Sequence, residues 1–551
     1  MTVRQIEGEF ATVDDVLRAA ASANADVEAY VEPATEVSPR RSVTFSEWDL
    51  AAGGVAGLFA DCGVTRGSVV CLLLPSSIEY MICYAAAVRL GAVTSGINLR
   101  LGAPEVRSIL ERTRPVVTVV EDGAPHPGPS AGSVLERSAV RVSVDGPGAR
   151  NLPALAQSDP VAVVWTSGTT GMPKGAVFDH ANLRAVADGT DVLSEPGDRR
   201  LSPLPFAHVG SMTRMWDEIA NAVTTVITPT PWRAADAIRV MAEERITVAQ
   251  GVPTQWALLL AHPDLEGADV SSLRIAGTGA SRVPPELVAT MRERLGVPVV
   301  VRYTSTEASL GTGTVPGDPD LAVATTVGRP VPGVSLGLVD DDDDGASVAP
   351  GDVGRVLLRS AAVMRGYWGG PLRGPGVEGV AYDDTATAAV LGKDAWLTTG
   401  DFGFLDGDGR LHLVGRANEL YIRGGYNVYP AEVEGVLGDH PDVGQVAVVG
   451  APDPVLGEVG VAFVVPAGDV PPDEHCLLDG LRSLVRDSLA DYKAPDRVVV
   501  VDALPLTSMM KVDKRILAER AATLPDAVSR PTVPKDGSGD RRETTNGARA
   551  S

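Results

Sequence analysis

Apolar runs and amphipathic stretches alternate along the first half of the chain. The apolar run at 68–74 predicts a buried strand, the segment 78–90 predicts a helix, and 116–120 predicts the next strand. The same alternation returns at 223–249 and again at 273–301. Strands that alternate with helices favour parallel sheets covered by helices. We therefore expect an α/β fold with a large N-terminal domain built of αβ layers.

The pattern changes after about residue 311. Short strands and Gly/Pro turns dominate there, and a run such as 354–358 indicates a β-rich subdomain. Further along, apolar strands again alternate with helical segments and indicate a smaller α+β domain. The last residues are polar and rich in Pro and Gly, which is typical of disorder. The predicted boundaries are 1–415 for the large domain, 416–522 for the small domain and 523–551 for the tail.

Composition narrows the class of protein. The chain has 551 residues, 44% of them hydrophobic, and a formal net charge of −23. Nucleic-acid binding and anionic membrane surfaces are disfavoured because there is no basic run. No apolar stretch reaches the roughly 18–20 residues that a membrane span needs, and residues 1–5 do not resemble a signal peptide. We expect a cytoplasmic protein that binds no nucleic acid.

The segment 163–175 is the most informative for chemistry. An apolar strand enters a loop of hydroxyls and glycines that ends in a lysine. Glycines allow backbone N–H groups to approach oxygens closely, while hydroxyls and an ammonium add donors, so the loop suits a polyphosphate. Its spacing is not that of the Walker loop. The candidate phosphate residues are Thr166, Ser167, Gly168, Thr169, Thr170 and Lys174.

This segment closely resembles the nucleotide-phosphate loop of the adenylate-forming superfamily, which includes acyl-CoA synthetases, adenylation domains of peptide synthetases and beetle luciferases. A second motif, 302–307, is similar to the Tyr-x-x-Thr-Glu motif of that superfamily. The resemblance implies that Tyr303 stacks on adenine, Thr306 holds the α-phosphate and Glu307 binds Mg²⁺. Just upstream, Gly279 and Ala280 belong to a small-residue loop like the one that lines the adenine and acyl sites.

Further motifs follow in the order of the family. Asp401 is similar to the aspartate that grips the ribose, and Arg416 matches the second ribose contact. The loop at 422–430 resembles the Gly-Gly loop of a mobile C-terminal domain, so Gly424 and Gly425 would line the coenzyme A tunnel. Glycines suit a narrow tunnel because no Cβ blocks it.

The lysine motif at 505–515 resembles the C-terminal motif whose lysine, here Lys511, bridges the carboxylate and the α-phosphate. His208 lies where relatives place a gate between the carboxylate site and the thiol tunnel. Two positions depart from the family pattern. Met510 stands where a glycine is usual, and the hinge position is Asn418, which tolerates left-handed backbone geometry.

The resemblance implies two steps. A carboxylate attacks the α-phosphate of ATP to give an acyl-adenylate, and the thiol of coenzyme A then gives a thioester and AMP. The implied cofactors are ATP, Mg²⁺ and coenzyme A. Alternatives are an acyl-AMP ligase that serves an acyl carrier protein, a luciferase-like oxygenase, and a non-catalytic adenylate-binding module. Retention of Lys511 and Glu307 disfavours the last.

The acid is left open by the sequence. Residues expected near it are mostly apolar and include no obvious carboxylate for an α-amino group, so we expect a hydrophobic acid, whether fatty, aryl or polycyclic. The expected acyl-pocket residues are His208, Trp216, Gly251, Trp256, Gly279 and Thr304.

Overall fold

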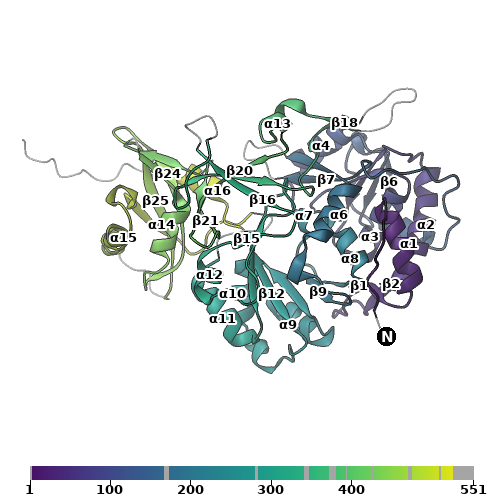
Figure 1. Ribbon diagram of the computed structural model, residues 1–551, viewed down its shortest axis with the longest axis horizontal. Helices are drawn as coiled ribbons and strands as arrows, with labels where there is room; N and C mark the ends of the chain where they lie inside the picture. The colour runs from purple at the N-terminus through teal and green to yellow at the C-terminus, as the bar shows by residue number, and fades with distance from the viewer. Residues whose placement is uncertain are drawn as a thin grey trace, which may run out of the picture. The chain divides into compact units, whose positions relative to one another are not determined.

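The computed structural model describes residues 3–166, 173–279, 283–340, 346–371, 380–392, 394–417, 419–424, 426–468, 474–507 and 511–524. The chain divides into two compact units. The first is 1–420 together with 428–435 and 506–513, and the second comprises 421–427, 436–505 and the chain from 514 onward. The boundary predicted at residue 415 stays a prediction. Figure 1 shows the elements of both units with the labels used below.

One sheet of the first unit contains the strand that enters the candidate phosphate loop. Its parallel strands are near-continuous apolar runs, as expected where helices cover both faces. Three antiparallel strands, β8, β18 and β19, extend it beyond β7. In order the strands are β19 (Val380–Tyr382), β18 (Gly366–Pro371), β8 (Lys174–Asp179), β7 (Pro160–Thr166), β4 (Val93–Gly96), β3 (Val69–Leu73), β5 (Val117–Val120) and β6 (Ser133–Glu136).

A second sheet of the first unit carries the other candidate motifs. Its inner strands are parallel, and its edges are antiparallel. In order the strands are β15 (Arg329–Pro330), β14 (Thr312–Gly313), β13 (Val299–Tyr303), β12 (Ile275–Gly279), β11 (Val248–Gly251), β9 (Arg199–Ser202), β10 (Thr224–Ile227), β1 (Glu28–Glu32) and β2 (Arg41–Thr44).

Helices pack on these sheets, and their ends follow local sequence rules. Thr44 and Glu47 form a capping box at the start of α2. Helix α11 begins at Pro285 and ends at Leu295, and the next residue, Gly296, caps it with φ +69°. Helices α1, α2 and α3 lie side by side (Figure 1). The bounds are α1 (Val13–Ala23), α2 (Phe45–Asp61), α3 (Ile78–Arg89), α4 (Ala103–Thr113), α5 (Arg137–Ser143), α6 (His180–Asp188), α7 (Val209–Met212), α8 (Met215–Ala220), α9 (Ala234–Glu243), α10 (Pro253–Ala261), α11 (Pro285–Leu295), α12 (Asp320–Thr325) and α13 (Asp384–Ala388).

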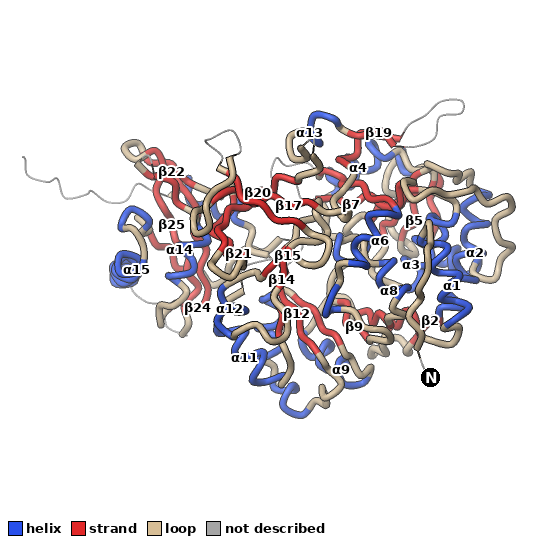
Figure 2. The backbone as a smooth tube through the Cα atoms, in the orientation of Figure 1, coloured by secondary structure: helices blue, strands red, loops and turns tan. Residues whose placement is uncertain are grey.

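The predicted β-rich subdomain forms an antiparallel sheet. Figure 2 shows its strands in red, and their order is β16 (Ser335–Val339), β17 (Gly354–Arg359), β20 (Leu397–Leu405) and β21 (Leu411–Arg416). Strands β20 and β21 are paired so that Asp401 lies opposite Arg416. The register of this hairpin therefore brings together two residues that the sequence separates.

The second unit is a small α+β assembly. Its sheet has the order β23 (Tyr426–Val428), β22 (Tyr421–Arg423), β25 (Gly457–Pro466) and β24 (Val443–Asp453), and β26 (Arg497–Val500) pairs with β25 in parallel. Helices α15 (Glu474–Ser488) and α16 (Lys514–Ala522) pack against β26 and β24. Helix α14 (Pro430–Leu437) spans the division between the units. The α/β fold with a large N-terminal part and a small C-terminal part is confirmed.

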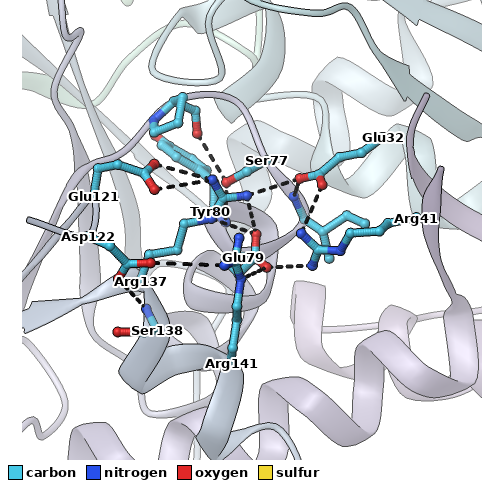
Figure 3. Close-up of polar contacts among 12 residues, drawn as sticks. Glu32, Arg41, Ser77, Glu79, Tyr80, Glu121, Asp122, Arg137, Ser138 and Arg141 are labelled. Carbon is cyan, nitrogen blue, oxygen red and sulfur yellow. Dashed lines mark hydrogen bonds and ion pairs between the residues drawn. The ribbon is translucent and has the colours of Figure 1, made fainter. Parts of the chain in front are cut away.

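A charged cluster joins the two sheets of the first unit. Glu79, in the first turn of α3, is only 1% exposed and accepts hydrogen bonds from Arg41 at 2.5 Å, Arg137 at 2.6 Å and Arg141 at 2.7 Å. Arg41 lies on β2 of one sheet, whereas the other two arginines lie on α5, which follows β6 of the other sheet. Glu32 at the end of β1 contacts Arg41 and Arg137 (Figure 3). Each buried charge is thus paired, as burial requires.

In the parts of the chain that the structure describes, no helix is both long enough and apolar enough to cross a membrane.

Candidate active site

Part of the predicted site lies outside the described residues: Ser167, Gly168, Thr169, Thr170, Ala280, Asn418 and Gly425, together with Met510. The two ends of the candidate phosphate loop are described. Thr166 ends β7 and Lys174 begins β8, and the two residues are paired across the antiparallel ladder. The strands therefore hold both ends of the loop together.

Three neighbouring parallel strands end together beside the second motif. Gly251 of β11 pairs with Thr278 of β12, and Gly279 pairs with Arg302 of β13. Carboxyl ends of parallel strands at one sheet edge are a frequent place for ligands in α/β proteins. A Cβ at Gly279 would lie 2.2 Å from the Arg302 carbonyl oxygen, so only glycine fits the close approach of the two strands.

Tyr303 ends β13 and reaches the β-rich subdomain. Its hydroxyl donates a hydrogen bond of 2.7 Å to Oδ2 of Asp401, whose Oδ1 pairs with Nε of Arg416 at 2.9 Å. Tyr303 and Asp401 are 7% and 6% exposed. Burial, and then the charge of Asp401, raises the pKa of Tyr303, so the phenol stays protonated. The structure therefore brings together three of the residues predicted to hold adenosine, Tyr303, Asp401 and Arg416.

Lys511 lies in the first unit within the segment 506–513. Its backbone N–H donates to the Thr507 hydroxyl at 3.2 Å, and its carbonyl accepts from the Thr507 N–H at 2.6 Å, which closes a short loop. Burial, and then the charge of Arg416, lowers the pKa of Lys511 to about 8. The carboxylates Asp401 and Glu419 also lie nearby and oppose this lowering of the pKa.

His208 precedes α7 as its N-cap. Its Nδ1 accepts a hydrogen bond of 3.2 Å from the Gly210 N–H. Burial, and then the charge of Lys511, lowers the pKa of His208 to about 4. The imidazole is therefore neutral at physiological pH, and it lies within electrostatic range of Lys511.

Thr304, Thr306 and Glu307 follow β13 in a turn. Thr304 is exposed, whereas Thr306 and Glu307 are half-buried. Oε1 of Glu307 accepts a hydrogen bond of 2.7 Å from the Tyr367 hydroxyl, and the Glu307 carbonyl accepts one of 2.8 Å from the Met364 N–H. The candidate metal ligand is therefore fixed through both its side chain and its backbone.

Tyr367 is a site residue that the sequence reasoning missed. It lies on β18, and its ring lies 5.2 Å from Nζ of Lys174. One side chain thus contacts both the lysine of the phosphate loop and the candidate metal ligand. The sequence around Tyr367 does not indicate this role, because its contacts with Lys174 and Glu307 depend on β18 lying beside β8.

Of the predicted acyl-pocket residues, the two tryptophans lie in two hydrophobic cores. Trp216 of α8 is buried in the core that contains Phe206, Val209 and Tyr303. Trp256 of α10 is buried in the neighbouring core, and its Nε1 donates to the Gly277 carbonyl at 3.0 Å. A Cβ on Gly251 would lie 3.2 Å from the same Nε1.

The remaining described tunnel residue lies in the second unit. Gly424 has φ +60°, a value that favours glycine, and its N–H donates to the Leu456 carbonyl at 2.8 Å. This positive φ accounts for a glycine at position 424.

Known proteins share both parts of this arrangement. Residues 17–368 match the family described as AMP-binding enzyme, and residues 432–511 match the AMP-binding enzyme C-terminal domain. An indoleacetate–CoA ligase of Aromatoleum aromaticum is 36% identical over 86% of this chain and 94% of its own length. A feruloyl-CoA synthase of Amycolatopsis sp. is 34% identical over 86% and 93%.

A solved structure agrees with these relatives. The anthranilate CoA ligase AuaEII in complex with anthranoyl-AMP is similar with a TM-score of 0.82 and 26% identity, covering 94% of this chain and 98% of that one. The resemblance to the adenylate-forming superfamily is confirmed. The chain belongs to the AMP-binding enzyme family and is an AMP-forming acid–thiol ligase, which activates a carboxylic acid with ATP and then transfers the acyl group to coenzyme A.

Proposed function

We propose that the protein activates a hydrophobic carboxylic acid of the aryl type, with Lys511 as the charge that drives adenylate formation. The observation that carries the role of Lys511 is its place in the first unit beside Arg416 and Asp401, the ion pair predicted to hold the ribose. Asp401 and Glu419 oppose the charges of Lys511 and Arg416. An ammonium at this position can stabilise the negative charge that develops on a phosphate.

In the proposed first step, the acid's carboxylate attacks the α-phosphorus of ATP and pyrophosphate leaves. The Lys511 ammonium stabilises the negative charge that builds on the α-phosphate oxygens and holds the carboxylate in line. Asp401 and Arg416 hold the ribose, Tyr303 faces adenine, and Thr306 donates to the α-phosphate. Lys174 and Thr166 hold the outer phosphates at the two ends of the loop.

Glu307 is the proposed magnesium ligand. A carboxylate oxygen is the kind of donor that Mg²⁺ prefers, and the Glu307 side chain is held in place by Tyr367 at 2.7 Å. Bound Mg²⁺ would neutralise charge on the phosphates during the displacement. The residues present therefore fit the metal that the family usually employs.

In the proposed second step, the thiol attacks the acyl carbonyl and AMP leaves. His208 separates the carboxylate site from the thiol path, and it acts as a neutral imidazole because its pKa is lowered to about 4. Gly424 and Gly425 line the path of the thiol arm, and Asn418 is the hinge. No side-chain nucleophile is required.

The aryl class is favoured by two considerations. Two relatives act on indoleacetate and ferulate, and a structural neighbour holds anthranoyl-AMP, all with aromatic acyl groups. Other relatives act on a bicyclic propanoate and on long-chain fatty acids. Trp256, one of the two buried tryptophans predicted to line the pocket, lies beside Gly251 at the end of β11. An amino acid is disfavoured because both acidic residues of α8 are engaged, Asp217 with Arg200 and Arg214, and Glu218 with Tyr30.

The test is mass spectrometry of reactions with Mg·ATP and indoleacetate, ferulate, anthranilate or a medium-chain fatty acid, each with and without coenzyme A. Aryl-CoA formed with a kcat/KM at least tenfold above that of the fatty acid supports the proposal. A preference for the fatty acid overturns the aryl class. Acyl-adenylate that accumulates and ignores coenzyme A would point to a carrier-protein acceptor.

A further inference from the structure

Tyr367 is placed by strand pairing against the phosphate-loop lysine. Strand β18 pairs with β8 in an antiparallel ladder, with Tyr367 opposite Ala176. Lys174 lies two residues before Ala176, so its side chain points to the same face, one diagonal step from Tyr367. That geometry accounts for the 5.2 Å separation between Nζ of Lys174 and the Tyr367 ring. The small side chain of Ala176 leaves room for the tyrosine ring.

The same tyrosine reaches the turn after β13. Its hydroxyl donates 2.7 Å to Oε1 of Glu307, and the segment just before β18 holds the Glu307 backbone through the Met364 N–H. Tyr367 is 4% exposed. A phenol hydroxyl donates and a carboxylate accepts, so the hydrogen bond runs from Tyr367 to Glu307.

We propose that Tyr367 is a positioning residue that couples the phosphate-loop lysine to the magnesium-binding carboxylate. By occupying one oxygen of Glu307, the phenol orients the other oxygen for the metal, and the electron-rich ring face steadies the Lys174 ammonium. This inference rests on the proposed role of Glu307. Tyr367 fixes the distance between Lys174 and Glu307, the two groups proposed to act on the same polyphosphate.

The two functions of Tyr367 can be separated by two variants. Tyr367→Phe removes the hydroxyl and keeps the ring, so it should weaken metal binding and spare Lys174. Tyr367→Leu removes both. The matched control is Tyr382→Phe on the adjacent strand β19, where the tyrosine is 37% exposed.

The first readout is binding without turnover. Calorimetry with α,β-methylene-ATP at a series of Mg²⁺ concentrations should show the half-saturating Mg²⁺ concentration raised about tenfold in Tyr367→Phe, the effect of losing a hydrogen bond to a charged group. Tyr367→Leu should also weaken nucleotide binding at saturating Mg²⁺ by a further few-fold. Tyr382→Phe should match wild type in both measurements. An unchanged Mg²⁺ dependence in Tyr367→Phe overturns the inference.

The second readout separates this inference from the proposed function. Pyrophosphate exchange should show the same shift in Mg²⁺ requirement for Tyr367→Phe, while thioester formation from supplied acyl-adenylate stays at the wild-type rate. Glu307→Gln should shift the Mg²⁺ requirement at least as much, and the double variant should be no worse than Glu307→Gln alone. If Glu307→Gln leaves Mg²⁺ dependence unchanged, the metal role itself is wrong. If only Tyr367→Phe leaves it unchanged, the coupling is wrong and the metal role stands.

Discussion

The Tyr303 hydroxyl donates a 2.7 Å hydrogen bond to Oδ2 of Asp401, and this links the end of a parallel strand to a hairpin of the β-rich subdomain. Asp401 pairs through its other oxygen with Arg416, its neighbour across the hairpin. Two fixed partners hold the carboxylate in one orientation before any ligand arrives, and a preoriented acceptor binds ribose hydroxyls at lower entropic cost.

Tyr303→Phe should therefore weaken ATP binding without blocking chemistry. We expect the KM for ATP to rise about tenfold, the effect of about 1.4 kcal/mol for a lost hydrogen bond to a charged group, with kcat changed less. Tyr84→Phe is the control, because it loses a buried hydrogen bond of 2.8 Å to the Met212 carbonyl. Steady-state kinetics with varied ATP would contradict the account if both variants behaved alike.

The lowered pKa of Lys511 predicts a pH dependence confined to the first half-reaction. The ammonium is charged below a pKa of about 8 and loses its proton above it. The rate of adenylate formation, measured by pyrophosphate exchange, should therefore decline as pH rises through about 8. Thioester formation from supplied acyl-adenylate should lack this limb, and Lys511→Arg should remove it from any residual exchange activity because arginine stays protonated. A limb shared by both half-reactions would contradict the assignment.

His208 should show no titration in the same range. Its pKa is lowered to about 4, so the ring is already neutral at pH 6. His208→Gln, which keeps a neutral polar side chain, should alter the ratio of acyl-CoA to released adenylate while leaving the pH profile between 6 and 9 in place. Product ratios by mass spectrometry measure the first effect. A pH limb near 6.5 that disappears in the variant would disprove the neutral form.

Stability of the first unit should depend on Glu79. Glu79→Gln leaves Arg137, 12% exposed, and two further arginines without their shared anion. Breaking a buried pair on one side costs about 3–5 kcal/mol. Glu121→Gln, which removes a 41% exposed partner of Arg137, should cost at most about 1 kcal/mol. Chemical unfolding compares the two, and equal losses would show that the cluster is not cooperative.

Lowering the pH should reduce the stabilisation that Glu79 gives to the same cluster. Burial alone would raise the pKa of Glu79, but the hydrogen bonds from Arg141 and Arg41 outweigh it and lower the pKa to about 2. The folded-state pKa lies below the ordinary value of 4.5, so the stabilisation is fully present above pH 4.5 and is lost as pH falls towards 2. The stability difference between wild type and Glu79→Gln should shrink over that interval. A constant difference would contradict the assignment.

Local sequence patterns predicted the elements well where burial is continuous. The apolar run 68–74 contains β3, and the segment 78–90 contains α3, which ends at Arg89 just before Gly91 with φ +67°. The runs 299–301 and 461–465 likewise lie inside β13 and β25. The periodicity of apolar side chains and the glycines that end helices are local features, so they can be read from a single sequence.

Contacts between segments that are distant in the sequence could not be predicted from these local patterns. Glu307 and Tyr367 are 60 positions apart, and their hydrogen bond depends on β18 pairing with β8, although residues 180–365 separate the two strands in the sequence. Glu79 and its partner Arg137 are 58 positions apart. Strand order and register determine such pairs, and neither follows from hydrophobic periodicity. Asp401 and Arg416 were identified by resemblance to family motifs, because those motifs include residues that the strand register of the family brings together.

The most direct test of the central claim is Lys511→Ala measured in both half-reactions. Pyrophosphate exchange should fall by about 10²–10³-fold, the cost of losing one charge aimed at a transition state, while coenzyme A should still convert supplied acyl-adenylate to acyl-CoA at a near wild-type rate. Loss of both half-reactions, or retention of both, would contradict the role of Lys511 as the group that drives adenylate formation.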